Sequence, residues 1–133
     1  MNIAFQYLYR DGGNYKKHGR VVFSNPDQLT PEFAGIALEN AFLPDGLFIA
    51  SQIRLPEVFL YSDEGFSCDD HCYHEFGSAR STQDVANDEH ARSISEFLAE
   101  VMTESTRGWQ VFDPYDSQGS LGSFLASRFS VSE

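Results

Sequence analysis

The chain begins with a regular alternation of apolar and polar positions, which is the pattern of a β-strand with one buried face. Over residues 3–10 every second side chain is bulky and apolar, and a β-prone run follows at residues 20–23. The Asp-Gly-Gly-Asn sequence at residues 11–14 supplies residue types that tolerate the positive φ angles of a tight turn. We therefore predict a β-hairpin over residues 3–24, which Pro26 ends because proline cannot continue a central strand.

A first helix is predicted to begin at Thr30, whose hydroxyl can cap the helix N-terminus. Pro31 suits the first helical turn, and Glu32 lies near the positive end of the helix dipole. The Pro-Asp-Gly sequence at residues 44–46 ends this helix. We expect its buried stripe to consist of Phe33, Ile36, Ala37 and Leu43.

A second helix has the strongest periodicity in the chain. Its apolar residues follow the i, i+3, i+4, i+7, i+8 spacing and are Ile94, Phe97, Leu98, Val101 and Met102. Ser93 and Glu96 match a capping box at the start, and Gly108 is a suitable stop.

Four further segments have strand character. Residues 47–55 alternate, residues 58–61 and 109–112 are β-prone runs, and residues 72–76 can form a short strand. The order is then β-β-α-β-β-β-α-β, with a polar connection over residues 77–90. Short connections between such elements predict the α+β class, with a mainly antiparallel sheet and two helices packed on one face.

The length and composition predict one domain over residues 1–133, with 114–133 as a loosely packed C-terminal tail. The 133 residues are 41% apolar and include 12 Phe and 6 Tyr, which is enough for one hydrophobic core. The N-terminus lacks the pattern of a secretory signal, and no segment has the roughly 20 apolar residues needed to cross a bilayer. We expect a cytoplasmic protein without membrane contact, in which Cys68 and Cys72 are thiols or ligands rather than a disulfide. The oligomeric state stays open, because residues 58–61 can pair with a second copy or lie inside the sheet.

The net charge of −11 is unevenly distributed along the chain. Four of the nine Lys and Arg residues fall within residues 1–20, whereas residues 57–75 hold six carboxylates and neither Lys nor Arg. This acidic excess disfavours binding to nucleic acid, because phosphate contacts depend on cationic side chains. It promotes solubility, and one alternative function is mimicry of nucleic acid toward a basic protein.

A dense cluster of metal-ligand side chains occupies residues 66–76. Zinc prefers thiolate and imidazole ligands, usually four in a structural site, and the candidate set is Cys68, His71, Cys72 and His74. Structural zinc sites usually combine two separated pairs of ligands, and this chain has no second cysteine pair. The competing interpretation is an acidic loop leading into an edge strand, with Cys72 buried and His74 hydrogen-bonded.

The sequence points to no catalytic residue. A nucleophilic cysteine needs a lowered thiol pKa, whereas Asp69 and Asp70 beside the cluster oppose thiolate formation. No phosphate-binding glycine loop is present, and with 20 acidic residues no catalytic carboxylate pair can be singled out.

The hairpin turn instead suggests a recognition surface. Tyrosine and cationic side chains interleave there, and both types give large contact areas and directional hydrogen bonds. The candidate interaction residues are Tyr9, Arg10, Tyr15, Lys16, Lys17 and Arg20.

Three segments resemble the N-terminal signature of a family of small, uncharacterised bacterial proteins. They are residues 7–11 (Tyr-Leu-Tyr-Arg-Asp), 13–16 (Gly-Asn-Tyr-Lys) and 21–26 (Val-Val-Phe-Ser-Asn-Pro), with a fainter similarity at residues 94–98. The resemblance implies a bacterial, cytoplasmic, single-domain protein and brings no activity or cofactor with it. The cysteine and histidine cluster is not part of the signature.

These observations favour a small interaction module that binds another protein or a small ligand and has no catalytic activity of its own. The alternatives are a metal-binding protein or metal-dependent hydrolase that uses residues 68–75, and the acidic mimic of nucleic acid.

Overall fold

The computed structural model describes residues 1–60 and 70–114. A hairpin of β1 (Asn2–Arg10) and β2 (Lys16–Phe23) confirms the first prediction. The turn is held by Asp11, whose backbone amide donates to the Tyr15 carbonyl at 3.0 Å and whose carboxylate accepts from the Tyr15 amide at 2.9 Å. Asn14 supplies the left-handed conformation, with φ of 70°.

The sheet has four strands in the order β2-β1-β4-β3, and every pairing is antiparallel. β4 (His74–Thr82) lies beside β1, and β3 (Leu47–Phe48) pairs with the start of β4. The register of β1 and β4 shifts between Gln6 and Tyr7, which is a β-bulge. Gly77 fits there because a Cβ would lie 3.0 Å from the Gln6 carbonyl oxygen.

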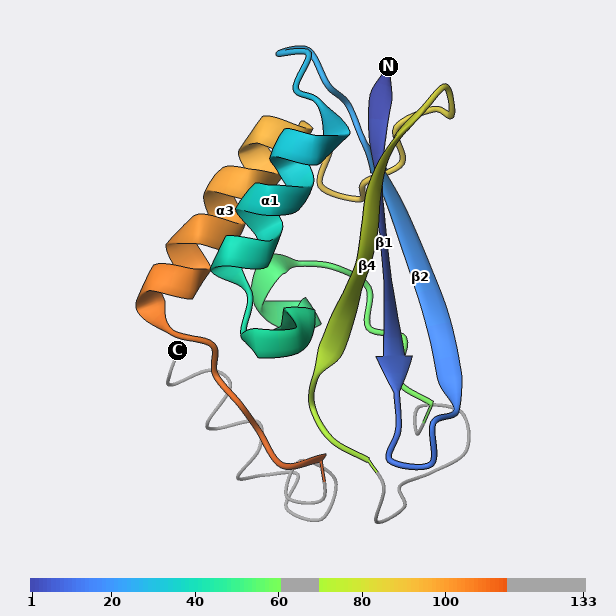
Figure 1. The fold of residues 1–133 in the computed structure, drawn as a ribbon, viewed down its shortest axis with the longest axis vertical. Coiled ribbons are helices and arrows are strands. Elements are labelled where there is room, and N and C mark those ends of the chain that lie inside the picture. Colours follow the sequence, from blue (N-terminus) through green and yellow to red (C-terminus); the bar gives the residue numbers. More distant parts are fainter. Residues whose placement is uncertain (61–69, 115–133) are drawn as a thin grey trace.

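Two helices pack against one face of this sheet, α1 (Pro31–Ala41) and α3 (Ile94–Arg107) (Figure 1). The Thr30 hydroxyl accepts from the Phe33 amide, and Ser93 and Glu96 form the capping box, so both predicted helix starts are confirmed. The α+β class is confirmed as well. Neither helix is long and apolar enough to cross a membrane, and no other described segment is a candidate span.

The connection between the helices differs from the predicted strands. Residues 47–55 form a strand only over β3 and then turn into the 3₁₀ helix η2 (Ala50–Ile53), which follows η1 (Pro44–Gly46). Local hydrogen bonds, such as Leu55 amide to Ala50 carbonyl at 3.0 Å, replace a ladder there. In the segment 58–60 the Val58 amide donates to a His74 ring nitrogen instead of a neighbouring strand. Residue 61 lies outside the described part.

Two other predicted boundaries are wrong. The short strand at residues 72–76 is the start of β4, which begins at His74 and continues into the stretch predicted to be a polar connection. Residues 109–112 form no strand: the Gln110 amide donates to the Gln52 side chain rather than to a neighbouring strand. The Trp109 indole donates to the Ala41 carbonyl at the end of α1. The predicted tail at 114–133 lies outside the described residues, except for Pro114.

The buried stripe of α1 is also rotated from the predicted one. Ala34, Leu38 and Ala41 face the core, whereas Phe33 and Ile36 are 57% and 59% exposed. Small alanines allow α1 to pack closely against its neighbours, so the helix buries its narrow face rather than its bulkiest one. Of the expected residues, Ala37 packs at the core margin, Leu43 is half-buried beyond the helix end, and Met102 of α3 is exposed.

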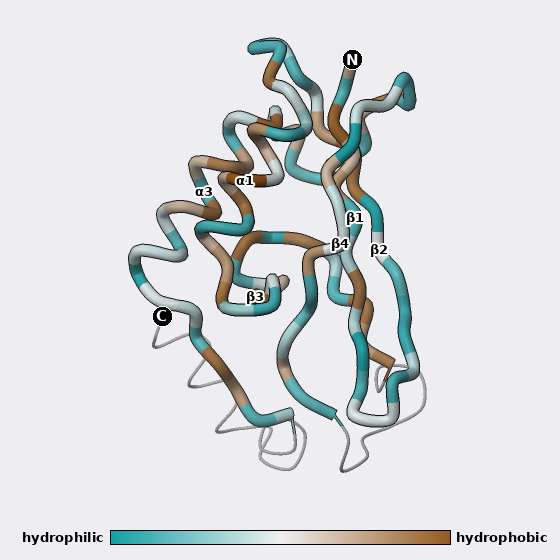
Figure 2. Tube along the Cα trace, viewed as in Figure 1, coloured by the Kyte–Doolittle hydropathy of each residue, from teal (hydrophilic) through white to brown (hydrophobic). Residues whose placement is uncertain are grey.

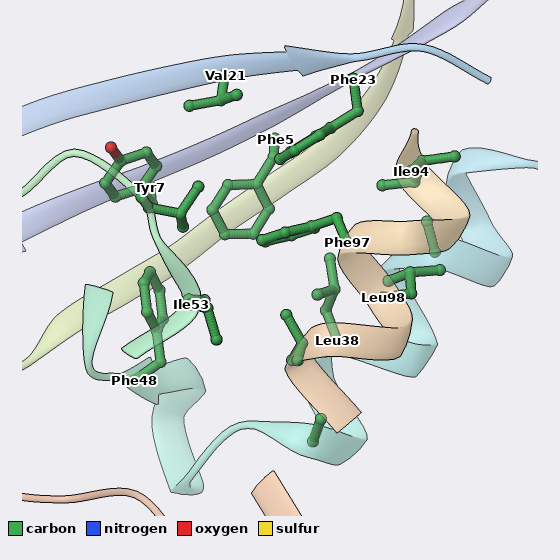
Figure 3. Close-up of a cluster of buried hydrophobic side chains, with 14 of the residues drawn as sticks. Phe5, Tyr7, Val21, Phe23, Leu38, Phe48, Ile53, Ile94, Phe97 and Leu98 are labelled. Carbon is green, nitrogen blue, oxygen red and sulfur yellow. The ribbon is translucent and has the colours of Figure 1, made fainter. Parts of the chain in front are cut away.

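Aromatic rings fill the space between the sheet and the helices (Figure 3). Phe5 of β1 is the central residue, with its ring 5.3 Å from that of Phe97 and 6.0 Å from that of Phe48. The rings of Phe23 and Phe97 stack at 4.3 Å and join the far strand to α3. Each of these side chains is fully buried, so together they fix the distance between α3 and the sheet.

A buried arginine closes one end of this core. Arg92 is 5% exposed, and its guanidinium lies over the rings of Phe23 and Phe97. All five guanidinium N–H groups have acceptors: the Asp88 carboxylate, Glu100, and the carbonyls of Ile53 and Arg54. Burial alone would raise the pKa of Asp88, but the hydrogen bonds and charge of Arg92 hold it below its usual value.

Candidate functional site

The outer face of the sheet is the surface turned away from α1 and α3. Because side chains alternate along a strand, Phe5 and Tyr7 face the helices while their neighbours point outward. The outward residues of the three long strands include Gln6, Leu8, Arg10, Lys16, His18, Arg20, Glu75, Ser78 and Arg80. Figure 2 shows that the half of β2 near the hairpin turn is hydrophilic. We refer to these outward residues of β1, β2 and β4 as the outer face.

Two cations of the outer face are paired with carboxylates. The guanidinium of Arg10 donates to both carboxylate oxygens of Glu75, which lies on the neighbouring strand β4, at 3.1 Å. Arg20 extends across the sheet and donates to Asp84 at 2.8 Å. These contacts hold both guanidinium groups against the sheet.

Lys16 and Arg80 complete the positive charge of the face. Both residues are exposed, and neither forms an ion pair within residues 1–60 and 70–114. The outer face therefore carries Arg10, Lys16, Arg20 and Arg80 against the carboxylates of Glu75 and Asp84. A locally positive surface thus lies on a chain whose net charge is −11.

The predicted hairpin residues divide between the two faces of the sheet. Register places Arg10, Lys16 and Arg20 together on the outer face, whereas Tyr9 and Lys17 are partners on the opposite face. Tyr9 is fully buried, so its assignment to an interaction surface is wrong. Tyr15 lies in the turn and is 72% exposed.

Tyr9 instead holds the loop that precedes β4. Its hydroxyl donates to an Asp70 carboxylate oxygen at 2.8 Å and accepts from the His71 amide at 3.0 Å. Burial raises the pKa of this phenol well above its ordinary value, so the hydroxyl keeps its proton.

Both ring nitrogens of His71 are occupied by the backbone. Its Nε2 lies 2.7 Å from the Arg10 carbonyl oxygen, and its Nδ1 accepts from the Tyr73 amide at 3.0 Å. This arrangement selects the neutral tautomer with the proton on Nε2. A metal ion would have to displace one of these two hydrogen bonds.

His74 lies inside an aromatic cluster at the start of β4. Its Nε2 accepts from the Val58 amide at 2.9 Å, and the rings of Phe59, Tyr9 and Tyr7 lie 4.5, 5.7 and 6.0 Å away. The proton is therefore on Nδ1, which has no hydrogen-bond partner in the described structure. Burial lowers the pKa of His74 to about 3, so the ring is neutral near pH 7.

Cys72 is a buried free thiol beside the chain at Phe112. Burial raises its pKa, although the Phe112 backbone offers a hydrogen bond that partly offsets the effect. Cys68 lies outside the described residues. Within the described part, no three His, Cys, Asp or Glu side chains converge as a metal site, so His71, Cys72 and His74 are not brought together there.

A separate depression of about 560 Å³ lies where the end of α1, η1 and β4 meet. The rings of Phe42 and Phe76 and the carboxylates of Glu39 and Asp45 line it. Its lining includes no Lys or Arg, so this groove is acidic and chemically distinct from the outer face.

Sequence reasoning missed Arg80 and the outward alternation around it. Phe76 and Ala79 both pack toward the core, yet three positions separate them because the bulge at Gly77 inserts one residue. The bulge interrupts the period of two that would have identified a strand. The only sequence feature that could have drawn attention to Arg80 was its position as an isolated arginine among small residues, most of them polar.

Comparisons with protein-family models, with curated proteins and with solved structures find no match to this chain. The N-terminal resemblance therefore stays a prediction.

Proposed function

We propose that this protein is a binding module without chemistry of its own, and that it recognises a carboxylate-rich protein partner through the outer face of its sheet. The observation that carries the proposal is the local reversal of charge: Lys16 and Arg80 are exposed and without an ion pair among the described residues, on a chain of net charge −11. Opposite charge across an interface favours encounter and orientation of the correct partner.

The paired arginines support the same partner class. Arg10 and Arg20 are already held in place by Glu75 and Asp84, so little side-chain freedom remains to be lost on binding. A guanidinium group has five donors, and one bound carboxylate leaves others available for a second acceptor.

A protein partner fits better than a nucleic acid. A long polyphosphate would extend beyond the outer face of a chain whose net charge is −11, and this excess of carboxylates would repel it, whereas a short acidic segment can stay within the face. The rival metal function would require His71 and His74 to give up the backbone hydrogen bonds that occupy their rings.

The proposal is tested with poly-L-glutamate as the probe and the full chain as the binder, near physiological salt. Arg80→Glu should weaken binding by about tenfold, because it reverses one cation of the outer face. Arg107→Glu is the matched control, since it makes the same change of charge on α3, at a side chain that is 55% exposed. Thermal unfolding of both variants confirms that they are folded.

Equal binding by wild type, Arg80→Glu and Arg107→Glu would overturn the proposal. Tighter binding to duplex DNA than to poly-L-glutamate, lost in Arg80→Glu, would instead identify the outer face as a nucleic-acid surface.

A further inference from the structure

β2 is an edge strand, and only part of its open edge is covered by the described residues. The Asn87 side chain accepts from the Val22 amide at 2.7 Å, and the Asn87 amide donates to the Val22 carbonyl at 2.9 Å. The Ser24 carbonyl accepts from the Ile94 amide at 2.7 Å. Val22 and Ser24 therefore direct their backbone groups away from β1, and these groups are hydrogen-bonded to Asn87 and Ile94.

Farther along the same edge, no described segment pairs with the backbone amide and carbonyl groups of Lys16, His18 and Arg20. Backbone direction alternates along an antiparallel strand, and β1 and β2 pair without a register shift. The amide and carbonyl groups of Lys16, His18 and Arg20 therefore point the same way as those of Val22. They form a row of hydrogen-bonding groups that a further strand can use.

The side chains of this edge decide which strand can add. Lys16, His18 and Arg20 are exposed and all lie on the outer face. Cationic edges repel one another, which disfavours pairing between two copies of β2. Opposite charges across neighbouring strands are stabilising, so a strand with carboxylates at alternate positions, about 6.8 Å apart, matches the row.

We infer that residues 16–20 of β2 are a docking edge for an extended acidic segment of a partner protein, which adds to the sheet as a further strand. This inference rests on the proposed function, since it uses the same cationic surface. It adds the mode of binding, in which backbone hydrogen bonds supply affinity and alternate carboxylates supply selectivity. The pairing of Asn87 with Val22 shows that the edge accepts such bonds within the chain itself.

The test uses a capped, fluorescently labelled peptide of about seven residues, the length of an ordinary strand, in which glutamate alternates with threonine. Two further peptides carry N-methyl groups, one on every glutamate and the other on every threonine. In an added strand only one of these two sets directs its N–H groups toward β2, whichever direction the strand takes. One methylated peptide should therefore bind at least about tenfold more weakly than the other.

A protein variant provides a second readout. His18→Pro removes an N–H that points away from β1, so it should weaken peptide binding while leaving the pairing of β1 and β2 intact. His18→Ala is its control, because it removes the same side chain and keeps the N–H. The N-methylated peptides need no folded variant, so the test stands even where His18→Pro does not fold.

The outcomes separate this inference from the proposed function. Equal binding of the two methylated peptides, with Arg80→Glu still weakening the unmodified peptide, would overturn strand addition and leave the outer face as the binding surface. Absence of binding by the unmodified peptide, together with absence of binding by poly-L-glutamate, would overturn both.

Discussion

Arg92 is the buried cation that links η2 to the residues before and within α3. Its five donors all have acceptors, and the guanidinium lies over the rings of Phe23 and Phe97. A buried charge is tolerated only when it is paired and hydrogen-bonded in this way. The sequence alone could not identify this role, because the acceptors include carbonyl groups of Ile53 and Arg54, far away along the chain.

Loss of this cation should therefore be costly. We expect Arg92→Met to lower the free energy of unfolding by about 3–5 kcal/mol, because the change leaves Asp88 buried without its partner. Arg54→Met is the control: Arg54 also pairs with Glu100, but its side chain is 49% exposed, and we expect a cost of about 1 kcal/mol or less. Urea unfolding at pH 7 measures both, and equal costs would contradict the central role of Arg92.

His74 makes a prediction for the pH dependence of stability. In the unfolded chain its pKa is near 6.5, whereas burial lowers it to about 3 in the folded protein. Between these two pKa values the unfolded state binds a proton that the folded state does not bind. The contribution of His74 to the free energy of unfolding is therefore fully present above about pH 6.5, and it falls as the pH decreases, by up to about 1.4 kcal/mol per pH unit.

The measurement is urea unfolding at pH 7 and at pH 5 for wild type and His74→Phe. Phenylalanine keeps an aromatic ring among Tyr7, Tyr9 and Phe59 but cannot titrate, so the variant should lose less stability between the two pH values. His18→Gln, at an exposed position, is the control that removes a histidine outside this aromatic cluster. A loss in His74→Phe as steep as in wild type would contradict this account.

Among the elements, those specified by neighbouring residues were predictable and those specified by distant contacts were not. The β1–β2 hairpin and both helix caps depend on turn and capping residues within a few positions, and all three are confirmed. β4 depends on pairing with β1 across some seventy residues, and its bulge interrupts the alternation. Several consecutive positions after β3 are buried, so the apolar side chains there fit a 3₁₀ helix as well as a strand.

The packing of β2 against β1 can be tested by comparing two glycines. Gly19→Ala would place a Cβ 2.5 Å from the Tyr7 ring, which is held by a hydrogen bond from its hydroxyl to the Pro56 carbonyl. We expect a loss of about 1–3 kcal/mol of stability. Gly35→Ala in α1 meets nothing within 4 Å and should stabilise the protein by about 0.5–1 kcal/mol. Thermal unfolding compares them, and effects of the same sign would contradict this packing.

For the whole molecule, the candidate site was partly predictable. The cations at the hairpin are visible in the sequence, and alternation correctly assigns Arg10 to the face opposite Tyr9 once the strand is known. Arg80 could be assigned to the outer face only once the register of β4 was known. The burial of Tyr9 could be recognised only from the loop at Asp70 and His71, which covers its hydroxyl. Neither contact is encoded by a local pattern.

The contrast between local and net charge predicts an unusual salt dependence. At about 10 mM salt the Debye length is about 30 Å, so the net charge of −11 repels an acidic peptide. At about 0.15 M the Debye length is about 8 Å, so the peptide is attracted mainly by the nearby cations of the outer face. At about 1 M the Debye length is about 3 Å, and little electrostatic attraction remains. Affinity for the alternating glutamate peptide should therefore rise and then fall with salt. A rise that continues to 1 M would contradict an electrostatic surface.

Mapping by NMR shows directly whether an acidic peptide binds the outer face of the sheet. Backbone amide shifts of the full chain are followed while the alternating glutamate peptide is added. We expect the largest changes at Lys16, His18, Arg20 and Arg80, with little change at the exposed α1 residues Phe33 and Ile36. Changes concentrated on α1 and α3, with the amides of β2 unmoved, would contradict it.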